Sequence, residues 1–168
     1  HILLDKLSSE SDPGLQTACA ASLGNLRCMQ AVPDLLRLLH DLPEASQRME
    51  IVLALVRILG EEQSFIRLHR QVRKDRAGAL AEAVSALEKL PGGLTGWQED
   101  LRACAEKFST AEIEPACQAF AQILLSAIPQ NTNLEHHTVL KTCAEILEEY
   151  GSDRLEVLLL ALNLLKKT

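Results

Sequence analysis

Residues 11–42 decide the fold, and they read SDPGLQTACAASLGNLRCMQAVPDLLRLLHDL. Asp12 stands directly before Pro13, as expected of a helix N-cap followed by a proline in the first turn. Apolar residues then recur with the spacing of one buried helical stripe, at Leu15, Ala18, Cys19, Leu23 and Leu26. A second, leucine-rich helix begins near Gln30, and it tolerates Pro33 because that residue falls in its first turn. The stretch therefore predicts a pair of helices.

The same apolar spacing continues along the chain and predicts further helices. Their expected ranges are 44–59, 62–74, 75–90, 97–108, about 109–128, about 132–150 and about 152–166. No stretch alternates apolar and polar residues for long enough to predict a strand. Leucine and alanine are good helix formers, and aromatic residues make up only 3% of the chain. We therefore expect an all-α fold.

Capping residues in the sequence indicate where three of these helices begin. Ser109 and Glu112 have the spacing of a capping box, and Thr132 and Glu135 repeat it. Ser152 is expected to cap the last helix.

An internal repeat underlies the helices. Residues 23–26 align with residues 87–90 at an offset of 64, and Leu59-Gly60 lies between them. Two repeats of about 32 residues match the period of paired helices in a solenoid. One such pair cannot bury its own apolar face, whereas stacked pairs can.

The residues of the first pair resemble a known repeat. An Asp12-Pro13 start, an alanine-rich helix ending at Leu23-Gly24, and Ala31-Val32-Pro33 before a leucine-rich helix resemble the short HEAT-like repeat also found in phycobilin lyases. The resemblance implies an α-α superhelix, or solenoid, of stacked antiparallel helix pairs. It implies no catalytic residue that this chain could inherit.

The resemblance extends unevenly along the chain. We predict one HEAT-like repeat domain over residues 1–168, clearest at 11–90, irregular at 91–131, with a further helix pair at 132–167. Because the sequence starts at His1 inside an apolar helical pattern, we expect it to be part of a longer chain.

Composition excludes several classes of function. The formal charge of −6 disfavours a nucleic-acid binder, whose surface is usually basic. The most apolar run, residues 157–165, is too short to insert into a membrane and contains Asn163. Most of the five cysteines lie among alanine and leucine, and we interpret them as small core residues of a protein in a reducing, cytoplasmic compartment.

The sequence predicts no catalytic residue, no cofactor-binding residue and no metal ligand. His136 and His137 are adjacent, so on a helix they point about 100° apart and do not converge on one ion. The chain has no glycine-rich phosphate loop, no nucleophile elbow and no Cys-x-x-Cys pair. We therefore expect no enzymatic activity.

One cluster of charge is a candidate binding site. Residues 67–76 carry one acid, Asp75, and five bases, which are Arg67, Arg70, Arg73, Lys74 and Arg76. The arginine fork suits bidentate pairing with carboxylates or phosphates. These five residues are our candidates for contact with an acidic partner protein, against the simpler interpretation of a solvated helix face.

The leading functional hypothesis is a non-enzymatic protein–protein interaction or scaffold module that uses a solenoid surface. Two alternatives stay open. One is a soluble regulatory segment of a larger membrane or signalling protein. The other, implied by the resemblance, is a subunit that assists tetrapyrrole attachment in the manner of phycobilin lyases.

Overall fold

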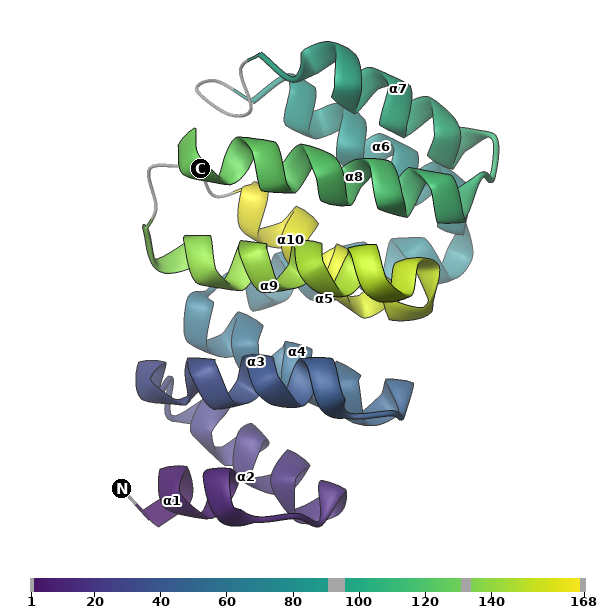
Figure 1. The fold of residues 1–168 in the computed structure, drawn as a ribbon. Coiled ribbons are helices and arrows are strands. Elements are labelled where there is room, and N and C mark those ends of the chain that lie inside the picture. The colour runs from purple at the N-terminus through teal and green to yellow at the C-terminus, as the bar shows by residue number, and fades with distance from the viewer. Residues whose placement is uncertain (1, 91–95, 131–133, 167–168) are drawn as a thin grey trace. The chain divides into compact units, whose positions relative to one another are not determined.

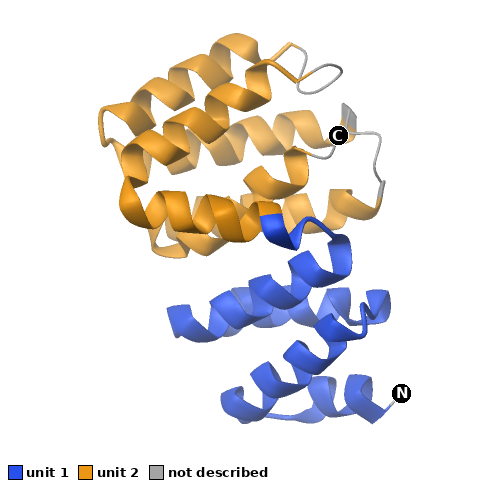
Figure 2. Cartoon of the chain, turned by 180° about the vertical axis from the view of Figure 1, so that it is seen from behind, with its two compact units in different colours: residues 1–63 blue, residues 64–168 orange. Residues whose placement is uncertain are grey.

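The computed structural model describes residues 2–90, 96–130 and 134–166, and every regular element in these ranges is a helix (Figure 1). The all-α prediction is confirmed. The chain divides into two compact units, residues 1–63 and residues 64–168 (Figure 2). The prediction of a single repeat domain over residues 1–168 stays a prediction.

Unit 1 contains two helix pairs. Its elements are α1 (Ile2–Ser9), α2 (Pro13–Asn25), the 3-10 turn η1 (Met29–Ala31), α3 (Val32–Asp41) and α4 (Ala45–Leu59). Asp12 caps α2 as predicted, because its Oδ1 accepts a hydrogen bond from the backbone N–H of Gly14 at 3.0 Å. The predicted buried stripe of α2 is wrong in part, because Cys19 and Leu23 are buried but Leu15 and Leu26 are 46% and 62% exposed. Gly60 follows α4 with a φ of 94°, a conformation that glycine adopts easily and that ends the helix.

Helices α2 and α4 pack closely at one glycine. A Cβ built on Gly24 would lie 2.8 Å from the Cα of Ala54 and 3.0 Å from its Cβ. The Leu-Gly end of the first repeat helix therefore serves packing, because only a residue without a side chain allows this approach.

A buried arginine holds the turn between α3 and α4. Arg48 is 3% exposed, and its Nη1 donates hydrogen bonds to the carbonyl oxygens of Leu42 at 3.0 Å and Pro43 at 2.7 Å. These bonds satisfy backbone acceptors that the end of a helix leaves unpaired.

Unit 2 holds the remaining helices. They are α5 (Glu62–Lys74, which begins just before the unit boundary), α6 (Arg76–Glu88), α7 (Gln98–Ser109), α8 (Ile113–Ala127), the 3-10 turn η2 (Ile128–Gln130), α9 (Leu134–Tyr150), the 3-10 turn η3 (Gly151–Arg154) and α10 (Leu155–Leu165). Helices α7, α8 and α9 form one layer, and α6 and α10 lie behind it (Figure 1). Every residue of α10 from Glu156 to Leu165 is buried, so this helix is the centre of the unit's core.

Helices α2 and α6 are equivalent members of the repeat. Each has 13 residues, and their buried positions match at the predicted offset of 64, with Leu23 0% and Leu87 2% exposed. One detail of the predicted alignment is wrong. It placed Asp12 opposite Arg76, but the residue that caps α6 is Asp75, whose Oδ1 accepts from the N–H of Gly78 at 3.1 Å. Helix α6 thus begins one residue earlier, at an offset of 63 from the start of α2.

Two capping predictions are also wrong. Ser109 is the last residue of α7, and its hydroxyl donates to the carbonyl of Glu106 at 2.8 Å instead of opening α8. Ser152 lies inside η3, and the residue before α10 is Arg154, which makes no side-chain cap. Short hydroxyl side chains bond to nearby carbonyls as readily as they cap helices, which explains the first error. The proposed cap at Thr132 lies outside the described residues.

Candidate functional site

The five basic residues singled out in the sequence are exposed in unit 2. We call Arg67, Arg70, Arg73 and Lys74 of α5, together with Arg76 at the start of α6, the basic face. The opposite side of α5 carries Phe65, Leu68 and Val72, which are 1%, 2% and 6% exposed. The helix therefore buries one side completely and leaves its cations in solvent, as the sequence predicted.

The cations of the basic face have no acidic partner within the parts of the chain that the structure describes. Elsewhere, Arg57 pairs with Glu62 at 3.1 Å and Arg37 with Asp34 at 3.3 Å. No ion pair of this kind involves any residue of the basic face. Asp75, the one acid in the segment, already accepts the backbone N–H of Gly78 as the cap of α6.

A shallow hollow borders the basic face where α5 meets α6. Its volume is about 400 Å³, and it is lined by Gln71, Lys74, Asp75, Gly78, Ala79 and Glu82. The hollow combines amide, ammonium and carboxylate groups with two small residues, so it offers polar contacts and room for a side chain.

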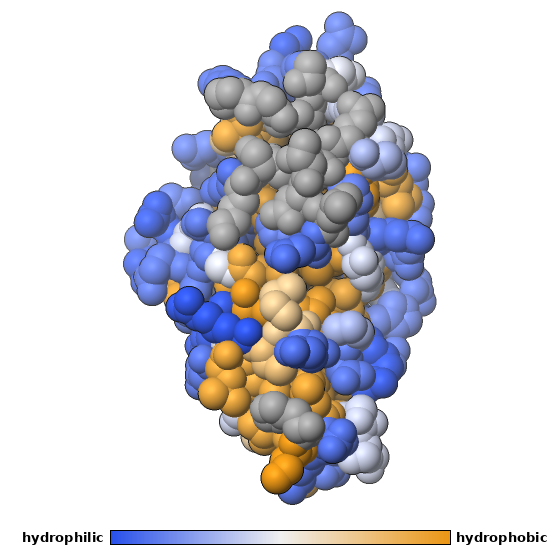
Figure 3. All heavy atoms as spheres, turned by 90° about the vertical axis from the view of Figure 1, so that its left-hand side faces the viewer, coloured by the Kyte–Doolittle hydropathy of each residue, from blue (hydrophilic) through white to orange (hydrophobic). Residues whose placement is uncertain are grey.

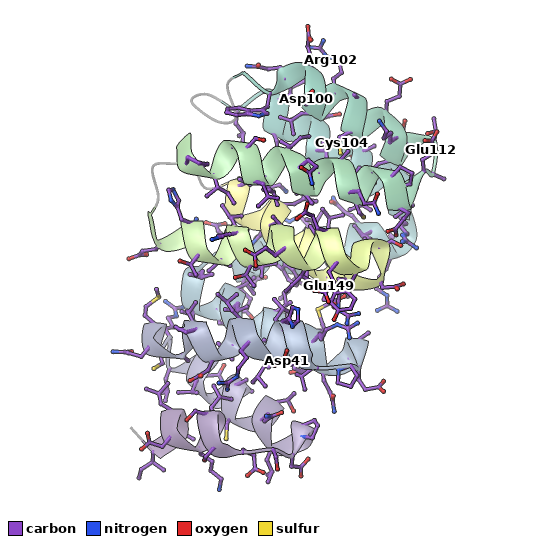
Figure 4. All side chains as sticks on the ribbon, in the orientation of Figure 1. Asp41, Asp100, Arg102, Cys104, Glu112 and Glu149 are labelled. Atoms are coloured by element: carbon purple, nitrogen blue, oxygen red, sulfur yellow. The ribbon has the colours of Figure 1, made fainter. Side chains whose placement is uncertain are left out.

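A second hollow, of about 310 Å³, lies between α7 and α8. It is lined by Trp97, Asp100, Ala103, Cys104, Lys107, Ala119, Gln122, Ile123 and Ser126. Burial raises the pKa of the Cys104 thiol to about 12, so this sulfur stays protonated at neutral pH and is a poor nucleophile. Figure 4 shows Arg102 on α7 and Glu112 before α8 away from Cys104, while Asp100 lines the same hollow as Cys104.

Two other cysteines, Cys117 and Cys143, resemble Cys104. Cys19, Cys117 and Cys143 are buried, and none of the five is in a disulfide. Burial raises the pKa of Cys117 to about 11 and that of Cys143 to about 12. The interpretation as core hydrophobes agrees with the positions of the four buried cysteines, whereas Cys28 is only half-buried and its Sγ donates to Gln30 Oε1 at 3.3 Å.

The adjacent histidines lie in different environments. His136 is 3% exposed, whereas His137 is half-buried, as expected for neighbours on one helix. Among the described residues, no group of three or more His, Cys, Asp or Glu side chains could hold a metal ion.

A carboxylate that the sequence did not reveal links α8 to η3. Glu114 Oε2 accepts hydrogen bonds from the backbone N–H of Ser152 at 2.9 Å and from its hydroxyl at 2.7 Å. These two bonds lower the pKa of Glu114 because they favour its ionised form. The two residues are 38 positions apart. The only feature of the sequence near this contact that could have indicated a turn is Gly151. Its φ of 57°, which glycine adopts easily, places the backbone N–H of Ser152 at the turn.

We expect Glu114→Gln to make stability less dependent on pH. Because the pKa of Glu114 is lowered in the fold, its ionised form stabilises the protein above the carboxyl's ordinary pKa, and this contribution disappears as pH falls through the lowered value. The urea midpoint of Glu114→Gln should therefore lie below that of the parent near pH 7, and the two should converge once the pH falls below the lowered pKa of Glu114. Glu82→Gln, which removes an exposed carboxylate from α6, is the control. A difference between parent and Glu114→Gln that persists unchanged into acid would contradict this assignment.

The described residues contain no helix that is both long and apolar enough to span a membrane. A protein-family model described as HEAT repeats matches residues 2–88. A search of curated proteins found no match, and neither did a search of solved structures.

Proposed function

Because this chain belongs to the HEAT-repeat family, we propose that it is a non-enzymatic module that binds an acidic segment of a partner protein through the basic face. HEAT repeats are commonly protein-interaction scaffolds, since their stacked helices present extended surfaces. The match covers α1 to α6, and so includes all five residues of the basic face.

The observation that carries the proposal is that no acidic side chain among the described residues forms an ion pair with these cations. Five like charges within ten residues repel one another, and packing does not require them because Phe65, Leu68 and Val72 bury the other side of α5. The surrounding chain is net acidic, at −6 overall, yet none of its described carboxylates pairs with the basic face. An external acidic segment would relieve this repulsion.

The chemistry of the partner follows from the composition of the face. Four of its five cations are arginine, whose planar fork pairs with carboxylates through two parallel hydrogen bonds. An acidic protein surface fits better than a nucleic acid, because the rest of the chain, with 12 bases and 23 acids, carries a formal charge of −11 that would repel a phosphate backbone. The free, mostly buried cysteines suit a reducing, cytoplasmic setting, within a longer protein or alone.

The test is charge reversal of the exposed face. Arg67, Arg70 and Lys74 are changed together to glutamate, and binding is measured by fluorescence anisotropy with a glutamate- and leucine-rich peptide, beside co-purification from a native lysate. We expect the Kd for the peptide to rise by at least about tenfold, and the proteins retained by the parent chain to be lost. Raising the salt concentration should weaken binding of the parent, because exposed charges are screened.

A matched control distinguishes the effect of losing the basic face from the effect of changing the net charge. Lys6, Lys89 and Lys141 are exposed, and changing them to glutamate gives the same change in net charge at dispersed positions. This control should retain peptide and partners, and circular dichroism should show both variants folded. Equal binding by the parent and the Arg67, Arg70, Lys74 variant would reject the basic face as a contact surface.

A further inference from the structure

Two hollows meet on the exposed side of α8 in unit 2. One is the hollow of about 310 Å³ between α7 and α8. The other has a volume of about 430 Å³ and is lined by Gln118, Ala119 and Gln122 of α8 and by Glu148 of α9. Both hollows are lined by Ala119 and Gln122, so together they form one groove that runs across α8 from α7 to α9, which lie side by side with it (Figure 1). We call it the α8 groove.

The α8 groove is polar. The large hydrophobic residues that are exposed in the described parts of the chain lie in unit 1, and Figure 3 shows hydrophobic surface gathered over the part of unit 1 that it presents. Residues 115–130, which include most of α8, contain no Asp, Glu, Lys or Arg. Helix α8 therefore contributes amides and small side chains to the groove, and the charges come from the helices on either side. These charged residues are Asp100 and Lys107 of α7 and Glu148 of α9.

The two glutamines of the groove are held with their amide oxygens available. Gln118 Nε2 donates to Glu114 Oε1 at 3.4 Å, and Gln122 Nε2 donates to Glu148 Oε2. Because a carboxylate can only accept, each bond fixes the amide with its N–H groups toward the acid. Neither glutamine Oε1 accepts a hydrogen bond within the described ranges. The groove thus offers mainly acceptors, so a matching ligand brings N–H donors.

The α7 end of the groove adds a carboxylate and an aromatic ring. Asp100 is exposed and Trp97 is half-buried, and Asp100 forms no ion pair with any residue that the structure describes. Lys107 lines the same hollow, but it lies about 10 Å along the helix axis from Asp100, at 1.5 Å per residue. A cation beside Asp100 is therefore close to a carboxylate and distant from the lysine. An arginine side chain fits this end best, since its fork pairs with a carboxylate and its plane stacks on an indole ring.

We propose that the α8 groove binds an extended segment of a partner protein that carries two basic residues in an Arg-x-Arg arrangement. The first arginine lies between Trp97 and Asp100, and the second meets Glu148. Packed helices are about 8–10 Å apart, and residues two apart in an extended chain point to the same side at a distance of about 7 Å, so this spacing reaches across α8. Between the two arginines the segment crosses Ala119, where its backbone N–H donates to Gln122 Oε1. The family match ends at residue 88, so this surface lies outside it.

A short peptide with Arg-Ser-Arg at its centre and glycine and serine on either side tests the groove. Trp97 is the single tryptophan of the sequence and the peptide has none, so the emission of Trp97 reports contact at the α7 end. We expect this emission to change with a saturable dependence on peptide concentration below about 1 mM, and to stay constant with a Glu-Ser-Glu peptide. Fluorescence anisotropy of a labelled peptide gives the Kd. An Arg-Ser-Arg peptide that does not bind, or that binds without changing the emission, would overturn the proposal.

Two pairs of substitutions with the same change in net charge show whether the groove is the binding surface. Asp100→Asn combined with Glu148→Gln neutralises the two groove carboxylates and should raise the Kd at least about tenfold. Glu106→Gln combined with Glu145→Gln is the control. It neutralises two exposed carboxylates of the same helices that do not line the groove, and it should leave the Kd unchanged. Equal weakening by both pairs would mean that the peptide responds only to net charge, and would reject the groove.

Gln122→Lys is a second disrupting variant. It places a cation where the two hollows meet and replaces an acceptor by a donor, so it should also raise the Kd at least about tenfold. Circular dichroism confirms that each variant is folded. If Gln122→Lys and the Asp100, Glu148 pair both fold and bind the peptide like the parent, the groove is not its site. All of these variants leave the basic face intact, so their outcome is independent of the test of that surface.

Discussion

Replacing Leu23 or Leu87 with alanine is expected to destabilise the protein by about 2–5 kcal/mol in each case. Both side chains are almost completely buried, at 0% and 2% exposure, and they occupy the same position of equivalent 13-residue helices in different units. Removing three carbons from either site leaves a cavity that the packed helices cannot close. Urea unfolding followed by circular dichroism measures the change in free energy.

Tryptophan fluorescence shows whether a substitution destabilises unit 2. Trp97 is the single tryptophan of the sequence and belongs to unit 2, so its emission follows the unfolding of that unit. Leu87→Ala should shift both the fluorescence and the circular dichroism transitions. Leu26→Ala is the control, because its side chain is 62% exposed and its removal leaves no cavity. A silent Leu23→Ala beside a destabilising Leu87→Ala would mean that the two helices are not equivalent members of the repeat.

Local signals in the sequence were sufficient for most helix boundaries. The pair Asp12-Pro13 and the lone Gly60 act through short-range hydrogen bonds and backbone conformation, so the sequence predicts α2 and the end of α4 directly. The prediction at Ser109 was wrong because its hydroxyl can either cap the following helix or donate to a carbonyl of the preceding one. It donates to the carbonyl of Glu106. A capping pattern is therefore a weaker signal where the residue also fits the last turn of the preceding helix.

Sequence patterns could not predict contacts between residues that are far apart in the chain. The bond from Ser152 to Glu114 joins residues that share no periodic pattern, and it exists because α8 and η3 lie side by side. The apolar run of residues 157–165 predicts a buried helix, but not its position behind α7, α8 and α9. The basic face, in contrast, was visible in the sequence, because one amphipathic helix determines both its buried and its exposed side.

Gly24→Ala is expected to destabilise unit 1 by about 1–3 kcal/mol, although alanine is the better helix former by about 1 kcal/mol. The added Cβ would lie 2.8 Å from the Cα and 3.3 Å from the carbonyl oxygen of Ala54, so the obstacle is backbone and α4 must move away. Gly14→Ala in the same helix is the matched control. Its Cβ would meet only the Asp12 carboxylate at 3.5 Å, an ordinary contact, so the helix preference of alanine should leave stability equal or higher.

A double variant shows that the backbone of α4 is responsible. In Gly24→Ala combined with Ala54→Gly, the side chain of residue 54 is gone, but its Cα and carbonyl oxygen remain within contact distance. We therefore expect the double variant to be no more stable than Gly24→Ala alone, as measured by urea unfolding. Full recovery of stability would show that the two helices are held apart by side chains. In that case the Leu-Gly end of the repeat helix would reflect side-chain volume instead of a close approach between the backbones of α2 and α4.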